Sequence, residues 1–186
     1  MAKTVTPGYK VVYPNREKPA SRLTRLAVAV TLLASAAVLL LVTVGGWSKL
    51  QGFKGVSLVW SLAYVVMAFY IFARWSRGLL PIASALAMLL FVVAVVAGLG
   101  VTGTSWFDRN HFGFGAPETI FGGRGLNPSL LGFLTVLLVP VQALLIFFAM
   151  VGFIQAWNVE TEVPDDDLSR RGGTSATPHR GAPATT

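Results

Sequence analysis

Residues 129–155, SLLGFLTVLLVPVQALLIFFAMVGFIQ, form the stretch that decides the fold. This stretch contains no Asp, Glu, Lys, Arg or His. The hydrocarbon core of a bilayer is roughly 30 Å thick, and about 20 helical residues cross it. Because lipid offers peptide groups no hydrogen bonds, such a segment must satisfy its own backbone as a helix. The sequence therefore predicts a transmembrane helix here.

Three more uncharged runs occupy residues 26–46, 55–73 and 79–101. The whole chain is 54% hydrophobic and only 12% charged, whereas soluble proteins average about 25% charged residues. The first run follows a basic stretch as a signal peptide does, but its apolar residues continue past the small-residue triplet at 34–36, so we expect it to stay uncleaved. The chain is thus predicted to be an all-α integral membrane protein with four transmembrane helices in an up-down bundle.

The lysines and arginines are unevenly divided between the two sides of these spans. One side carries eleven of them: Lys3, Lys10, Arg16, Lys18, Arg22, Arg25, Arg74, Arg77, Arg170, Arg171 and Arg180. The other side carries four: Lys49, Lys54, Arg109 and Arg124. The positive-inside rule then predicts a plasma (inner) membrane protein with both termini in the cytoplasm. Trp47 and Trp106 would mark the outer interface, and Trp75 and Trp157 the inner one.

Three regions follow from this division. Residues 1–25 are predicted to form a basic cytoplasmic arm, 26–156 a transmembrane domain with an outer loop at 102–128, and 157–186 a disordered cytoplasmic tail poor in large apolar residues. The arm is expected to lie extended on anionic lipid headgroups, with a strap gripping a partner subunit as the alternative. Nucleic acid is not expected as a partner, since the basic residues cluster beside the spans.

Several chemistries are excluded by what the spans lack. They hold no carboxylate and no histidine, whereas proton relays and ion-coupled transporters place ionisable groups within the membrane. Haem bound between helices by imidazole is excluded for the same reason. The absence of cysteine removes disulfides and thiolate metal sites. We expect no cofactor, no metal and no catalytic residue.

The fourth span carries the one deep amide, Gln142, two residues after Pro140. Thr135, Gln142 and Ala149 are spaced by sevens, which predicts a packing face with Gln142 as an interhelical hydrogen-bond donor. Pro140 removes a backbone donor and predicts a kink. In the alternative interpretation, Thr135, Pro140 and Gln142 line a transport pathway, as broken helices do in transporters.

The loop at residues 106–128 is longer than usual connections, and loops of this length tend to be functional or disordered. Its interaction candidates are Trp106, Asp108, Arg109, His111 and Phe112. His111 beside Asp108 is the minimum for acid-base chemistry, but no nucleophile is fixed beside the pair. Asp108, His111 and Glu118 could together ligate zinc in principle, but their spacing matches no known zinc-binding motif. At the end of the loop, Asn127 and Pro128 predict the capped start of the fourth helix.

Three functions remain open. The leading hypothesis is a non-enzymatic, multi-pass accessory or structural subunit of a larger plasma-membrane complex, bacterial by its composition, with other membrane subunits as partners. The first alternative is a small oligomeric transporter or channel with a pathway near Gln142 and Pro140. The second is a membrane enzyme or quinone-interacting subunit that uses the outer loop at 106–128.

Overall fold

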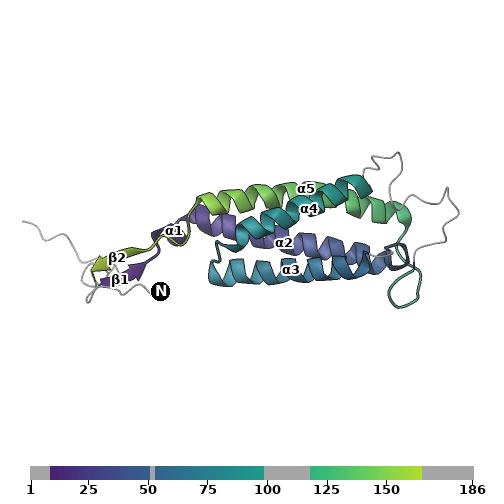
Figure 1. Cartoon of the computed structure of the whole chain (residues 1–186), viewed down its shortest axis with the longest axis horizontal. Helices are drawn as coiled ribbons and strands as arrows, with labels where there is room; N and C mark the ends of the chain where they lie inside the picture. Colours follow the sequence, from purple (N-terminus) through teal and green to yellow (C-terminus); the bar gives the residue numbers. More distant parts are fainter. Residues whose placement is uncertain (1–8, 51–52, 99–117, 165–186) are drawn as a thin grey trace, which may run out of the picture. The chain divides into compact units, whose positions relative to one another are not determined.

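The computed structural model describes residues 9–50, 53–98 and 118–164. Four long helices dominate it (Figure 1): α2 (Pro19–Gly45), α3 (Lys54–Arg74), α4 (Leu79–Gly98) and α5 (Pro128–Ile154). Each is long and apolar enough to cross a membrane. The prediction of four such helices is confirmed, and they fit a membrane-embedded protein. A short helix α1 (Pro14–Glu17) and a 3-10 turn η1 (Trp47–Lys49) flank α2.

The helix limits differ from the predicted spans mainly at the start of α2, which begins at Pro19 rather than at residue 26. Proline at the first helical position is preorganised for a helix because its φ is fixed. Arg22 and Arg25 therefore lie within α2, where long side chains can reach the membrane surface. The part of α4 that the structure describes ends at Gly98, so the predicted limit at residue 101 lies outside the described residues.

Helix α5 begins as the sequence predicts. The Asn127 side-chain oxygen accepts a hydrogen bond of 2.9 Å from the Ser129 backbone N–H, and Pro128 occupies the first turn. The predicted cap is confirmed. The helix then continues through Pro140 to Ile154 without a break in its assignment.

Helix α2 packs against α3 and α5, and α5 also packs against α4, whereas α3 and α4 touch only weakly. The Thr43 hydroxyl of α2 lies 2.9 Å from the Ser57 hydroxyl of α3, whereas Arg25 of α2 stacks on Phe72 of α3. These two contacts make α2 and α3 antiparallel. We call the end where α2 begins and α5 finishes the Trp157 end, and the opposite end the Leu50 end.

The inside of the bundle combines large apolar side chains such as Leu32 and Ile71 with many small ones, and large apolar side chains also cover its outside. The buried small residues include Ser35, Ala36, Ser57, Ser61, Ala83, Ala87, Ala94 and Gly98. Exposed large residues include Leu23, Val59, Leu62, Phe69, Phe133 and Ile154. Small inward residues let helix backbones approach closely, as in membrane helix pairs. An outer surface this apolar is stable in lipid and would be an aggregation hazard in water.

Residues through Pro14 and from Val159 onward form a separate unit. Its strands β1 (Tyr9–Val12) and β2 (Thr161–Pro164) pair antiparallel, with Tyr9 opposite Pro164 and Val12 opposite Thr161. The Tyr13 hydroxyl donates to the Glu160 carboxylate at 3.1 Å. Strand β2 lies within the tail that was expected to be disordered from residue 157, and residues 165–186 of that tail lie outside the described residues. The arm is extended at β1, and its contact with lipid headgroups stays a prediction. Each strand finds its backbone partners on the other terminal segment, which no local pattern reveals.

Candidate functional site

The polar centre of the helical bundle is built around Gln142 of α5, which is fully buried. Its side-chain oxygen accepts a hydrogen bond of 2.9 Å from the Tyr64 hydroxyl of α3. Its nitrogen donates to the Ser35 hydroxyl of α2, also at 2.9 Å, and Ser35 donates onward to the Thr31 carbonyl at 2.7 Å. The amide thus connects three helices. We call Ser35, Tyr64 and Gln142 the polar core.

Of the three residues proposed from sequence as a pathway, the structure brings two to the interior. Thr135 is buried and donates to the Leu131 carbonyl of its own helix at 2.8 Å. Pro140 is exposed on the outer surface of α5. Because Pro140 and Gln142 lie on different faces of the helix, the set does not converge on one site.

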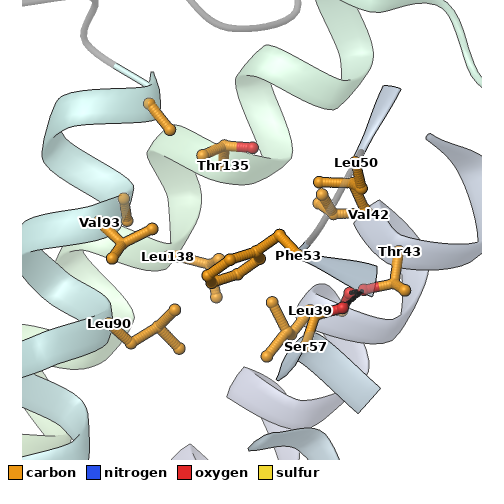
Figure 2. A pocket seen from close by; sticks show the side chains of 12 residues that line it. Leu39, Val42, Thr43, Leu50, Phe53, Ser57, Leu90, Val93, Thr135 and Leu138 are labelled. Carbon is orange, nitrogen blue, oxygen red and sulfur yellow. Dashed lines mark hydrogen bonds between the residues drawn. The ribbon is translucent and has the colours of Figure 1, made fainter. Parts of the chain in front are cut away.

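A cavity of about 30 Å³ lies between the four helices toward the Leu50 end. Figure 2 shows the Phe53 ring among Leu39, Leu90 and Leu138, which come from α2, α4 and α5. The hydroxyls at its edge are used within the protein, since Ser57 accepts from Thr43 and donates to the Lys54 carbonyl. Space of this size holds about one water molecule, and a water needs two or more polar partners to stay. We therefore interpret the cavity as a small space left by imperfect side-chain packing. Its described lining residues offer a polar substrate no free hydrogen-bonding group.

The Trp157 end of the bundle is closed by an indole. Trp157 is fully buried, and its ring meets Trp75 edge to face with 5.5 Å between centroids. Its Nε1 donates to the Gln155 side-chain oxygen, and the Gln155 nitrogen donates to the Thr24 hydroxyl, each at 2.9 Å. From the sequence, Trp157 is predicted to lie at the inner lipid interface, where amphipathic rings sit. It is instead buried, because Gly152 leaves room for the ring: an added Cβ would lie 3.0 Å from Trp157 Cζ2.

The outer-loop candidates Trp106, Asp108, Arg109, His111 and Phe112 lie outside the described residues. The end of that loop is described from Glu118, whose backbone N–H donates to the Ser48 hydroxyl at 2.8 Å. Glu118 also forms an isolated antiparallel bridge with Arg124. This part of the loop therefore rests on the turn that follows α2.

The arrangement offers neutral hydrogen bonds and close packing. None of α2, α3, α4 and α5 contains Asp, Glu or His, so these helices carry no carboxylate or imidazole for proton transfer. Sequence reasoning singled out Gln142 but missed its partners Ser35 and Tyr64. The spacing of small residues could have found both partners. Ser35 follows Ala27 and Thr31 at four-residue spacing, and Tyr64 lies on the same helix face as Ser57 and Ser61.

Comparison with known protein families, with curated proteins and with solved structures gives no match for this chain.

Proposed function

We propose that this chain is a non-enzymatic, multi-pass membrane protein that serves as an accessory or structural subunit of a larger plasma-membrane complex. The polar core carries the proposal. Gln142 is the amide best placed to bind a substrate within the membrane, and both its oxygen and its nitrogen already bond to neighbouring helices. A group used in this way stabilises helix association. Because both ends of the Gln142 amide are bonded to neighbouring helices, the amide is not free to bind a transported molecule.

The transporter alternative loses support from the same geometry. Pro140 itself is exposed, and the carbonyl that it leaves without a donor is that of Val136, four residues earlier. The backbone at Val136 packs against Gly98 of α4, so it borders a close helix contact. Broken helices serve transport where their freed backbone groups line a cavity. The cavity near the Leu50 end is lined mainly by apolar side chains. Its polar lining residues are Thr43, Ser57 and Thr135, and Gln142 does not line it.

The test of the accessory role is what the protein assembles with. Extraction from its own membrane in a mild detergent, followed by native mass measurement of the full chain, should give a complex with other membrane subunits in fixed ratio. An isolated monomer or a small homo-oligomer would contradict the proposal. Reconstituted vesicles provide the matching transport control, because a flux that Gln142→Ala abolishes would restore the transporter.

The proposal includes an up-down bundle with both termini in the cytoplasm. Among the described residues of 15–158, the Trp157 end carries more basic side chains than the Leu50 end, and the positive-inside rule places the more basic end in the cytoplasm. The basic residues at the Trp157 end are Arg16, Lys18, Arg22, Arg25, Arg74 and Arg77, and those at the Leu50 end are Lys49, Lys54 and Arg124. The chain has no cysteine, so single cysteines can be labelled without background. Gly78, between α3 and α4, and Gly123, at the Leu50 end, are both exposed. A membrane-impermeant maleimide should label Gly123→Cys in intact cells and Gly78→Cys only after lysis. The reverse pattern would overturn the orientation.

A further inference from the structure

Arg25 sits on an aromatic surface at the Trp157 end of the bundle. Its guanidinium carbon lies 3.9 Å from the ring centroid of Trp75 and 4.9 Å from that of Phe72. Cation–π contacts of this kind hold a guanidinium flat against a ring. The Arg25 Nε is buried and has no hydrogen-bond partner among the described residues. A buried charged donor left unpaired is costly. Because this Nε is closed to the surroundings and the side chain as a whole is only half-buried, a ligand would pair with the other nitrogens of the guanidinium and so offset the charge.

More positive charge surrounds this arginine. Arg22 lies one turn earlier on α2, Arg74 ends α3, and the Arg16 guanidinium carbon lies 5.8 Å from the Trp75 ring centroid. Arg16 donates to the Trp157 carbonyl and to the Asn158 side-chain oxygen, which fixes its side chain beside Trp75. Within residues 15–158, the acids that the structure describes are Glu17, exposed in α1, and Glu118 at the Leu50 end. Among the described residues of 15–158, the Trp157 end therefore carries more positive than negative charge.

A surface suited to hydrocarbon adjoins this charge. On α3, Phe72 is 48% exposed, and Phe69, one turn nearer the middle of the helix, is 63% exposed. On α2, Leu26 follows Arg25 directly and is 48% exposed. A ligand whose anionic group pairs with Arg25 would thus meet apolar side chains next to it. This combination of anion and hydrocarbon describes an amphiphile better than it describes an acidic peptide.

We propose that Arg25, held flat by Trp75 and Phe72, is a binding site for the headgroup phosphate of an anionic phospholipid in the leaflet at the Trp157 end. Arginine presents a planar fork of donors that matches phosphate oxygens. Arg22 and Arg74 supply further charge at the headgroup level, and the acyl chains lie along Phe69 and Leu26. Basic pockets at the ends of transmembrane helices recognise anionic lipids in this way. The site requires a bilayer and no partner subunit, so it goes beyond the accessory role.

The test is native mass spectrometry of the purified full-length chain with phosphatidylglycerol or phosphatidylcholine of identical acyl chains. The chain should retain phosphatidylglycerol in preference. Each basic residue near an anionic surface contributes about 1 kcal/mol, which corresponds to about a five-fold loss of bound phosphatidylglycerol for Arg25→Gln. Arg124→Gln removes the same charge at the Leu50 end and should leave binding unchanged. Inorganic phosphate at the same concentration should not displace the lipid, because it lacks acyl chains.

Two further variants keep the proposal falsifiable if Arg25→Gln does not fold. Arg25→Lys keeps the charge but loses the planar fork, and Arg22→Gln changes an exposed residue; both should bind less phosphatidylglycerol. Wild-type binding by both variants would overturn the site. Equal retention of phosphatidylglycerol and phosphatidylcholine would overturn it as well. Equal losses of bound phosphatidylglycerol in Arg25→Gln and Arg124→Gln would also overturn it, because they would show that the lipid is attracted by the overall charge and not by one site. Displacement by inorganic phosphate alone would indicate a free-anion site. None of these outcomes depends on whether other subunits co-purify.

Discussion

Replacing Gln142 by Met tests whether the polar core holds the bundle together. Methionine keeps an unbranched chain of similar length and removes the amide. The variant loses the hydrogen bonds to Tyr64 and Ser35 and leaves the buried Tyr64 hydroxyl without its acceptor. Interhelical hydrogen bonds in membranes contribute about 0.6 kcal/mol on average and at most about 1.7 kcal/mol. Two such bonds and one orphaned hydroxyl give an expected destabilisation of about 1–3 kcal/mol.

A double-mutant cycle with Tyr64→Phe separates this hydrogen bond from packing effects. Unfolding in mixed detergent, followed by tryptophan fluorescence, gives the free energy of unfolding of both single variants and of the double variant. Because removing both partners leaves no orphaned group, we expect the double variant to lose less than the two single variants together, by about 0.5–1.5 kcal/mol. Tyr70→Phe is the matched control: Tyr70 is 41% exposed on the same helix, and its loss should change stability by less than about 0.5 kcal/mol. Additivity within about 0.3 kcal/mol would refute a structural role for the Tyr64–Gln142 bond.

Two further substitutions test the close contact between α4 and α5 at Gly98 and the N-terminal cap of α5 at Asn127. A Cβ at Gly98 would lie 3.0 Å from the Val136 backbone nitrogen, so Gly98→Ala should lower the free energy of unfolding by about 1–3 kcal/mol. Gly55→Ala is the control, because a Cβ there meets nothing within 4 Å; it should be neutral or stabilising by up to about 1 kcal/mol. Equal thermal unfolding midpoints for Gly98→Ala and Gly55→Ala would contradict the close approach of Gly98 to the Val136 backbone. Asn127→Ala removes the acceptor for the Ser129 N–H and should cost about 1 kcal/mol, whereas Asn127→Asp keeps the cap. An unchanged midpoint for Asn127→Ala would show that the cap does not stabilise α5.

The four helices could be predicted because the membrane imposes a signal within each segment. Length and absence of charge are properties of a single run, so residues 129–155 alone predict α5 closely. The start of α2 was placed too late because Arg22 and Arg25 resemble flanking charges. Nothing local shows that Arg25 finds the Trp75 and Phe72 rings on another helix.

Contacts between distant residues set the limit of the sequence argument. Gln142 could be singled out as an isolated amide in an apolar run, but Tyr64 and Ser35 lie 78 and 107 residues away from it. Which residues meet depends on how each helix is rotated about its axis, and the weak amphipathicity of membrane helices leaves that rotation open. The β1–β2 pairing is hidden for a similar reason. Two four-residue strands carry little pattern, and their partners lie at opposite ends of the chain.

The β1–β2 ladder places Tyr9 directly opposite Pro164. Paired residues in an antiparallel ladder have Cα atoms about 5 Å apart, so a short linker can join these two positions and close the chain into a ring. Opening the ring at Gly78, which is exposed between α3 and α4, would give a circular permutant in which α4 comes first and α3 last. The same helix contacts would then form from a different order of synthesis, with no linker crossing the bilayer.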